Sequence, residues 1–155
     1  MQVSLKIKLL FYWYRIFGKN NRQNKLVKIS KKGKGVTSVL FLLPAEKKYA
    51  QLASHFIKKD NKKLKKHYSY LVHEESLKYY QNHLFENSFV ILENDLNWFG
   101  ALSSDKIINK INSEKFDAVV DLNIFSNQSL SLIINRLDIP IKVGFENLFS
   151  TLLYS

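Results

Sequence analysis

Short apolar runs alternate with longer segments of helical periodicity over most of this 155-residue chain. Five runs have the length and composition of strands buried on both faces of a sheet, at residues 37–44, 67–73, 88–93, 116–122 and 141–145. Four segments between them repeat apolar residues at helical spacing, at residues 46–59, 74–84, 104–115 and 127–138. This alternation predicts parallel strands joined by crossover helices.

The predicted architecture is one α/β domain over residues 36–155, with a parallel sheet of about five strands. Right-handed crossovers favour a Rossmann-like, doubly wound sheet with strand order 3-2-1-4-5. In such a sheet the winding reverses between the first and fourth strands, and ligands bind outside the carboxyl ends of the strands there. The loops at residues 44–47 and 121–128 should therefore form a crevice.

A basic, aromatic arm and linker, residues 1–35, precede the predicted domain. Helical spacing over residues 3–17 gathers Lys8 and Arg15 on one narrow face and leaves the rest of the circumference mostly apolar. The stretch is too short and too charged for a transmembrane helix, and it lacks the apolar core and cleavage site of a signal peptide. We therefore expect an extra amphipathic helix before the sheet.

Two interpretations of this helix remain open. In the first, it lies in the interface of an anionic membrane through Lys8, Trp13, Arg15 and Phe17, which makes the protein cytoplasmic and peripheral to the inner membrane. In the second, it packs on the domain or on another copy of the chain, which would give a homodimer.

The charge is unevenly distributed along the chain, whose net charge is +11. Through Tyr68 there are 18 Lys and Arg residues and 2 acids, whereas from Ser69 onward there are 6 and 11. A basic half suits an anionic partner such as a membrane surface or nucleic acid. The most basic run, residues 58–70, also suits the end of a helix, where lysines complement the dipole. Nucleic-acid binding is accordingly the weaker hypothesis.

Candidate ligand-binding residues lie at or after the ends of the first and fourth predicted strands: Glu46, Asp121, Asn123 and Asn127. At the carboxyl edge of the sheet, Asp121 suits binding of a ligand hydroxyl or action as a base. Asp121 equally suits capping of backbone N–H groups in its own loop. Glu46 suits the first turn of a helix, where a negative charge complements the dipole. Trp98, in the loop at residues 94–100, suits a pocket, a protein contact or a cover over the sheet edge.

The sequence offers no clear catalytic or metal-binding motif. The chain has no cysteine, which excludes disulfides, thiolate zinc sites and a cysteine nucleophile. Its four histidines are dispersed, without a carboxylate at metal-ligand spacing. No G-x-G-x-x-G follows the first strand, and no G-x-S-x-G elbow anchors a catalytic triad. We therefore expect no catalytic residue, no metal and no cofactor.

The stretch FDAVVDLNIFSNQSLSLIINRLDIPIKVGF, residues 116–145, resembles the end of the N-terminal half of heptosyltransferase-type (GT-B) glycosyltransferases. That family has a YDLVIDLQ strand, a helix of small and apolar residues and an RIGF strand in succession. The matching residues are Asp117, Val119, Asp121, Leu122, Gly144 and Phe145. The resemblance covers about residues 37–145, extends to short bacterial proteins with this half-domain, and implies a Rossmann-like fold.

The departures from the family bear on activity. In the family, a glycine-rich loop after the first strand carries a Gly-Asp pair whose aspartate looks like the catalytic base, but here the loop reads LPAEKKYAQ. The family also holds its nucleotide sugar on a second Rossmann-like domain, which we expect to be missing here. The resemblance therefore implies a half-domain that is not an enzyme by itself and acts through protein contacts. The alternative is a ligand-binding or acceptor-side half of a split glycosyltransferase that uses the crevice.

Overall fold

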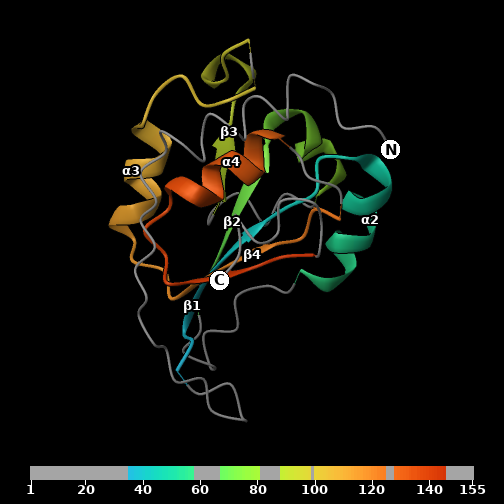
Figure 1. Cartoon of the computed structure of the whole chain (residues 1–155). Coiled ribbons are helices and arrows are strands. Elements are labelled where there is room, and N and C mark those ends of the chain that lie inside the picture. Colours follow the sequence, from blue (N-terminus) through green and yellow to red (C-terminus); the bar gives the residue numbers. More distant parts are fainter. Residues whose placement is uncertain (1–34, 58–66, 81–87, 99, 125–127, 146–155) are drawn as a thin grey trace.

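A computed structural model of the chain describes residues 35–57, 67–80, 88–98, 100–124 and 128–145. Its five strands are β1 (Ser38–Leu42), β2 (His67–His73), β3 (Ser88–Ile91), β4 (Ala118–Asp121) and β5 (Ile141–Val143). They form one sheet in the order β3-β2-β1-β4-β5, with every neighbouring pair parallel (Figure 1). This confirms the predicted Rossmann-like fold and strand order. The predicted arm helix, with Lys8, Trp13, Arg15 and Phe17, lies outside the described residues.

In the described residues, three of the four predicted crossovers contain an α-helix. These are α2 (Lys47–Phe56), α3 (Lys106–Ser113) and α4 (Gln128–Arg136). The first of them lies on the opposite side of the sheet from α3 and α4 (Figure 1). Helices on both faces are what a doubly wound sheet requires, because the winding reverses between β1 and β4.

The second crossover differs from the prediction of an α-helix over residues 74–84. Its described part is a 3-10 helix, η2 (Glu74–Tyr79), which ends where Tyr80 adopts an extended conformation. The backbone N–H of Tyr80 donates to the carbonyl of Leu77, three residues earlier. The prediction is therefore wrong up to Tyr80, although Tyr80 itself is buried as its place on the apolar face indicates. A second 3-10 turn, η4 (Glu93–Asp95), follows β3.

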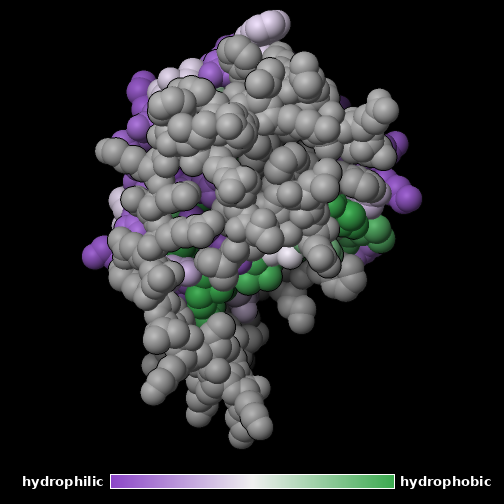
Figure 2. All heavy atoms as spheres, viewed as in Figure 1, coloured by the Kyte–Doolittle hydropathy of each residue, from purple (hydrophilic) through white to green (hydrophobic). Residues whose placement is uncertain are grey.

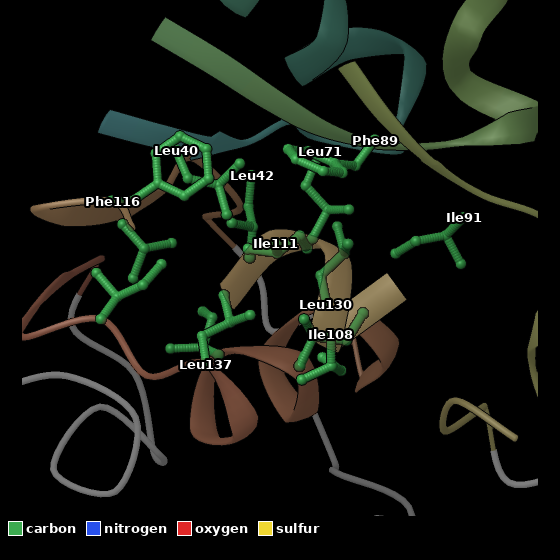
Figure 3. Packing of buried hydrophobic residues seen from close by; sticks show 14 of the residues in the cluster. Leu40, Leu42, Leu71, Phe89, Ile91, Ile108, Ile111, Phe116, Leu130 and Leu137 are labelled. Atoms are coloured by element: carbon green, nitrogen blue, oxygen red, sulfur yellow. The ribbon is translucent and has the colours of Figure 1, made fainter. Parts of the chain in front are cut away.

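The larger hydrophobic core lies between one face of the sheet and helices α3 and α4 (Figure 3). The strands contribute alternate residues, among them Leu40, Leu42, Leu71, Phe89 and Ile91. The helices contribute Ile108 and Ile111 from α3 and Leu130 and Ile133 from α4. Most of these side chains are fully buried, so this cluster supplies the main hydrophobic stabilisation of the domain.

A smaller core covers the opposite face of the sheet, under α2 and η2. Leu43, Tyr70 and Val72 from the strand side pack there with Ala50 and Ala53 of α2. Successive strand residues therefore enter different cores: Leu71 enters the larger one, and its neighbours Tyr70 and Val72 enter the smaller one. This burial on both faces is the reason why the strands read as continuous apolar runs.

Asp117 joins the amino ends of the two central strands. Its carboxylate oxygen Oδ2 accepts hydrogen bonds from the Thr37 backbone N–H (2.8 Å), the Thr37 hydroxyl (3.0 Å) and the Ser38 backbone N–H (2.9 Å). In return, the Asp117 backbone N–H donates to the Ser38 carbonyl at 3.0 Å. Burial acts to raise the pKa of Asp117, but the hydrogen bonds from Thr37 and Ser38 outweigh it and hold the pKa below its ordinary value.

We expect Asp117→Asn to lower the free energy of unfolding at pH 7 by about 1–2 kcal/mol, because hydrogen bonds to a charged acceptor are the stronger kind and Asp117 is only partly buried. Since the folded pKa is depressed, this stabilisation is present above the ordinary aspartate pKa of about 3.9 and is lost as the pH falls through the folded pKa. Urea unfolding of both proteins at several pH values measures the difference. The matched control is Glu75→Gln, at an exposed position of η2. A difference independent of pH between 7 and 3 would contradict this assignment.

Candidate functional site

The loops that follow β1 and β4 leave the sheet side by side. Leu42, the last residue of β1, lies opposite Asp121, the last residue of β4. Just beyond, the Leu122 backbone N–H donates to the Leu42 carbonyl at 3.1 Å. Asp121 is therefore at the carboxyl edge of the sheet, at the position where doubly wound sheets bind their ligands.

Asp121 and Asn123 form a buried polar pair at this edge. Their side chains belong to residues that are only 2% and 6% exposed. The Asp121 Oδ1 atom accepts hydrogen bonds from the Asn123 backbone N–H at 2.9 Å and from the Asn123 side-chain amide, Nδ2, at 2.7 Å. An aspartate that binds the backbone two residues on forms an Asx turn, which shapes the start of a loop. The interpretation of Asp121 as a cap for its own loop is thus confirmed.

Glu46 lies in the region that follows β1. Glu46 is exposed and occupies the N-cap position of α2, where its backbone carbonyl accepts hydrogen bonds from Tyr49 (3.1 Å) and Ala50 (2.8 Å). Its side chain makes no capping hydrogen bond to the helix. Asn127 lies outside the described residues. Of the four predicted ligand-binding residues, the structure therefore brings together Asp121 and Asn123, with Glu46 in the neighbouring loop region.

Tyr80 also contributes to this edge of the sheet, a role that the sequence does not predict. Its hydroxyl donates a hydrogen bond of 2.7 Å to the carbonyl of Pro44, within the loop after β1, and both groups are buried. Burial raises the pKa of the Tyr80 hydroxyl well above its ordinary value, so it remains a donor at neutral pH. Helical spacing marked Tyr80 as a core residue, but no sequence signal links it to a carbonyl 36 residues earlier.

Large apolar side chains are exposed near the carboxyl ends of three strands. Leu92 and Trp98 follow β3, Ile124 follows β4, and Phe145 follows β5, with exposed fractions of 43%, 82%, 40% and 46%. Trp98 consequently covers little of the sheet edge with its side chain. Figure 2 shows apolar residues (green) reaching the surface between hydrophilic ones (purple) on one face of the molecule.

Searches for similar proteins give no match to a family model, a curated protein or a solved structure. The resemblance to heptosyltransferase half-domains therefore stays a prediction from the sequence. In the part of the chain that the structure describes, no three acidic or histidine side chains come together as metal ligands. Within the same described ranges, no helix has both the length and the apolar character needed to cross a bilayer.

We expect Asn123→Ala to lower the free energy of unfolding by about 1–3 kcal/mol, because it removes a donor from a buried carboxylate. Urea unfolding measures the change, and Asn109→Ala, at an exposed position of α3, is the control. A double-mutant cycle with Asp121→Ala should give a coupling energy above about 0.5 kcal/mol, since each side chain acts through the other. If Asn123→Ala left stability unchanged, the pair would have no structural role.

Proposed function

We propose that this protein is a non-catalytic Rossmann-like domain that acts through protein contacts at the carboxyl edge of its sheet. The exposed side chain of Trp98, in the loop region after β3, is the observation that carries the proposal. Single exposed apolar residues are ordinary on protein surfaces. However, tryptophan is enriched among the residues that dominate binding energy at interfaces, and Leu92, Ile124 and Phe145 follow carboxyl ends of strands at the same edge.

The two acids near the point where the winding reverses, between β1 and β4, support a non-catalytic role. The Asp121 carboxylate receives two hydrogen bonds from Asn123, which gives its burial a structural explanation. Glu46, the acid nearest to the loop after β1, is exposed at a helix N-cap. A general base needs a carboxylate held within hydrogen-bond reach of its substrate. The Asp121 carboxylate is instead buried against Asn123, and Glu46 lies exposed at the start of a helix.

The predicted location of the protein rests on the arm at residues 1–35. Its basic and aromatic composition supports peripheral attachment to the cytoplasmic face of an anionic membrane. This attachment would concentrate the domain near membrane-associated partners without changing the contact surface on the sheet edge.

We expect a photo-cross-linking phenylalanine analogue at position 98 to give a discrete adduct of higher mass in cells of the native host. The exposure of Trp98 makes the replacement compatible with folding. The control is the same analogue at Glu114, which lies near His67 at the opposite, amino edge of the sheet. Gel mobility and mass spectrometry identify the adducts. Adducts of equal yield at both positions, or none at position 98, would contradict the proposal.

A second candidate function is ligand binding in the crevice between the loops after β1 and β4, as the acceptor-side half of a split glycosyltransferase. The observation in its favour is the burial of two polar side chains, Asp121 and Asn123, at the edge where such sheets bind ligands.

The two candidates differ in their response to a panel of nucleotides, nucleotide sugars and sugar phosphates. If the protein acts only through protein contacts, no member of the panel should raise the melting temperature, because a ligand stabilises only a protein that binds it. Differential scanning fluorimetry measures this. A rise that Asp121→Ala abolishes would overturn the first proposal in favour of the second.

A further inference from the structure

Part of one sheet face lies beyond the smaller hydrophobic core. In β1, Leu40 enters the larger core, whereas Phe41 packs against the smaller core on the opposite face. Val39, two residues before Phe41, shares its face, because alternate residues of a strand point to the same side. In β4, Val119 enters the larger core, so Val120 points to the opposite face. Val39 and Val120 therefore lie on the same face of the sheet as α2.

The strand register extends this apolar surface onto β5. Val143 lies opposite Val120 in the parallel pair of β4 and β5, so the two side chains point to the same face. Ile141, two residues before Val143, shares that face. Lys142 lies between them and points the other way, because its Nζ atom donates a hydrogen bond of 2.8 Å to the Ile134 carbonyl of α4.

We call this surface the β5 face and define it by four residues: Val39, Val120, Ile141 and Val143. Among the described residues, none of the four belongs to either core. The first three are half-buried, and Val143 is 48% exposed. A strand with one face in water alternates apolar and polar residues, whereas parallel sheets are covered on both faces. The apolar composition of the β5 face therefore indicates that a further element covers it.

The residues that follow β5 have the pattern of a short amphipathic helix. Residues 146–155, which lie outside the described residues, read ENLFSTLLYS. Helical spacing places Ser150 and Thr151 on the polar side of this segment. The apolar side carries Leu148, Phe149, Leu152 and Leu153. A helix this short is marginal in water unless its apolar side packs against another surface.

The apolar side of this segment matches the β5 face in size. Since β4 lies between β1 and β5, the three strands span about 10 Å, which is about the diameter of a helix. A helix rises about 7.5 Å from Leu148 to Leu153. Along β5, Ile141 and Val143 are separated by about 6.6 Å. One short helix is therefore sufficient to cover the β5 face.

The place of this segment in the chain favours it over other occupants. Glu146 comes directly after Phe145, two residues beyond the end of β5. A segment tethered so closely has a high effective concentration at the β5 face, whereas a second copy must associate from solution. The arm would have to close a longer loop through residues 18–34, which costs more conformational entropy.

We propose that residues 146–155 dock on the β5 face as a short helix, with their apolar side against the strands. This inference goes beyond the proposed function and does not depend on it. It assigns to the chain itself the second cover that a parallel sheet needs. The basic, aromatic arm at residues 1–35 then remains available for a membrane surface.

Alkylation of a single introduced thiol tests the proposal in the full-length chain, which has no cysteine of its own. The probe is Val143→Cys, and its reaction rate with iodoacetamide reports how far the β5 face is covered. We expect Phe149→Asp/Leu153→Asp to raise this rate at least fivefold, because charges on the apolar side release the segment. The matched control is Ser150→Asp/Thr151→Asp, which adds the same charge on the polar side and should leave the rate within a factor of two.

A second thiol separates release of the segment from unfolding of the domain. Ile108 lies in the larger core and is buried. A thiol at Ile108→Cys should therefore stay unreactive when Phe149→Asp/Leu153→Asp is present. Equal acceleration at both positions would overturn the proposal, because the segment would then be part of the domain fold and not a separate cover. An unchanged rate at position 143, or equal effects of the polar-side control, would also overturn it.

The other occupants of the β5 face give different results in the same assay. If the arm covers this face, Trp13→Asp/Phe17→Asp accelerates alkylation at position 143 and Phe149→Asp/Leu153→Asp does not. If a second copy covers it, the rate falls as the protein concentration rises. Either result would overturn the proposal. The cross-linking experiment at position 98 tests the proposed function separately, because it does not use the β5 face.

Discussion

The pairing of β1 with β4 is the contact on which the rest of the molecule depends. It joins segments about 80 residues apart, whereas β2, β3 and β5 each pair with the strand that precedes or follows them in the chain. Hydrogen bonds from Thr37 and Ser38 to Asp117 stabilise this pairing at the amino ends of the two strands. The hydrogen bond from the Leu122 N–H to the Leu42 carbonyl extends it at their carboxyl ends. Because the winding reverses here, the same pairing decides which helices cover each face of the sheet.

The fold was largely predictable because burial on both faces leaves a strong mark on the sequence. Each strand is a continuous apolar run, and the handedness of crossovers then favours one strand order. The wrong prediction of an α-helix at residues 74–84 also has a physical cause. Spacings of three and four residues both occur on an apolar helical face, so Leu77 and Tyr80 fit either a 3-10 or an α-helix. The hydrogen bond from Tyr80 to Pro44, which accompanies the extended backbone at this residue, depends on tertiary structure.

The candidate site was predictable in position but not in role. The end of the fourth strand located Asp121 correctly, yet an aspartate that caps a loop and one that binds a ligand have the same sequence signature. The hydrogen bonds from Asn123 to Asp121, which make it a cap, are visible only in the structure.

Two aspartates lie at the ends of β4: Asp117 just before it and Asp121 as its last residue. They affect how proteins of this architecture can be compared by sequence. Asp117 and Asp121 are among the residues on which the predicted resemblance to glycosyltransferases rests. Each has a structural partner here: Thr37 and Ser38 for Asp117, and Asn123 for Asp121. Selection for a correctly assembled sheet would therefore retain both acids in proteins that carry out no shared reaction. A motif built on them would therefore group sequences by how their central strands are joined, and not by the reaction they carry out.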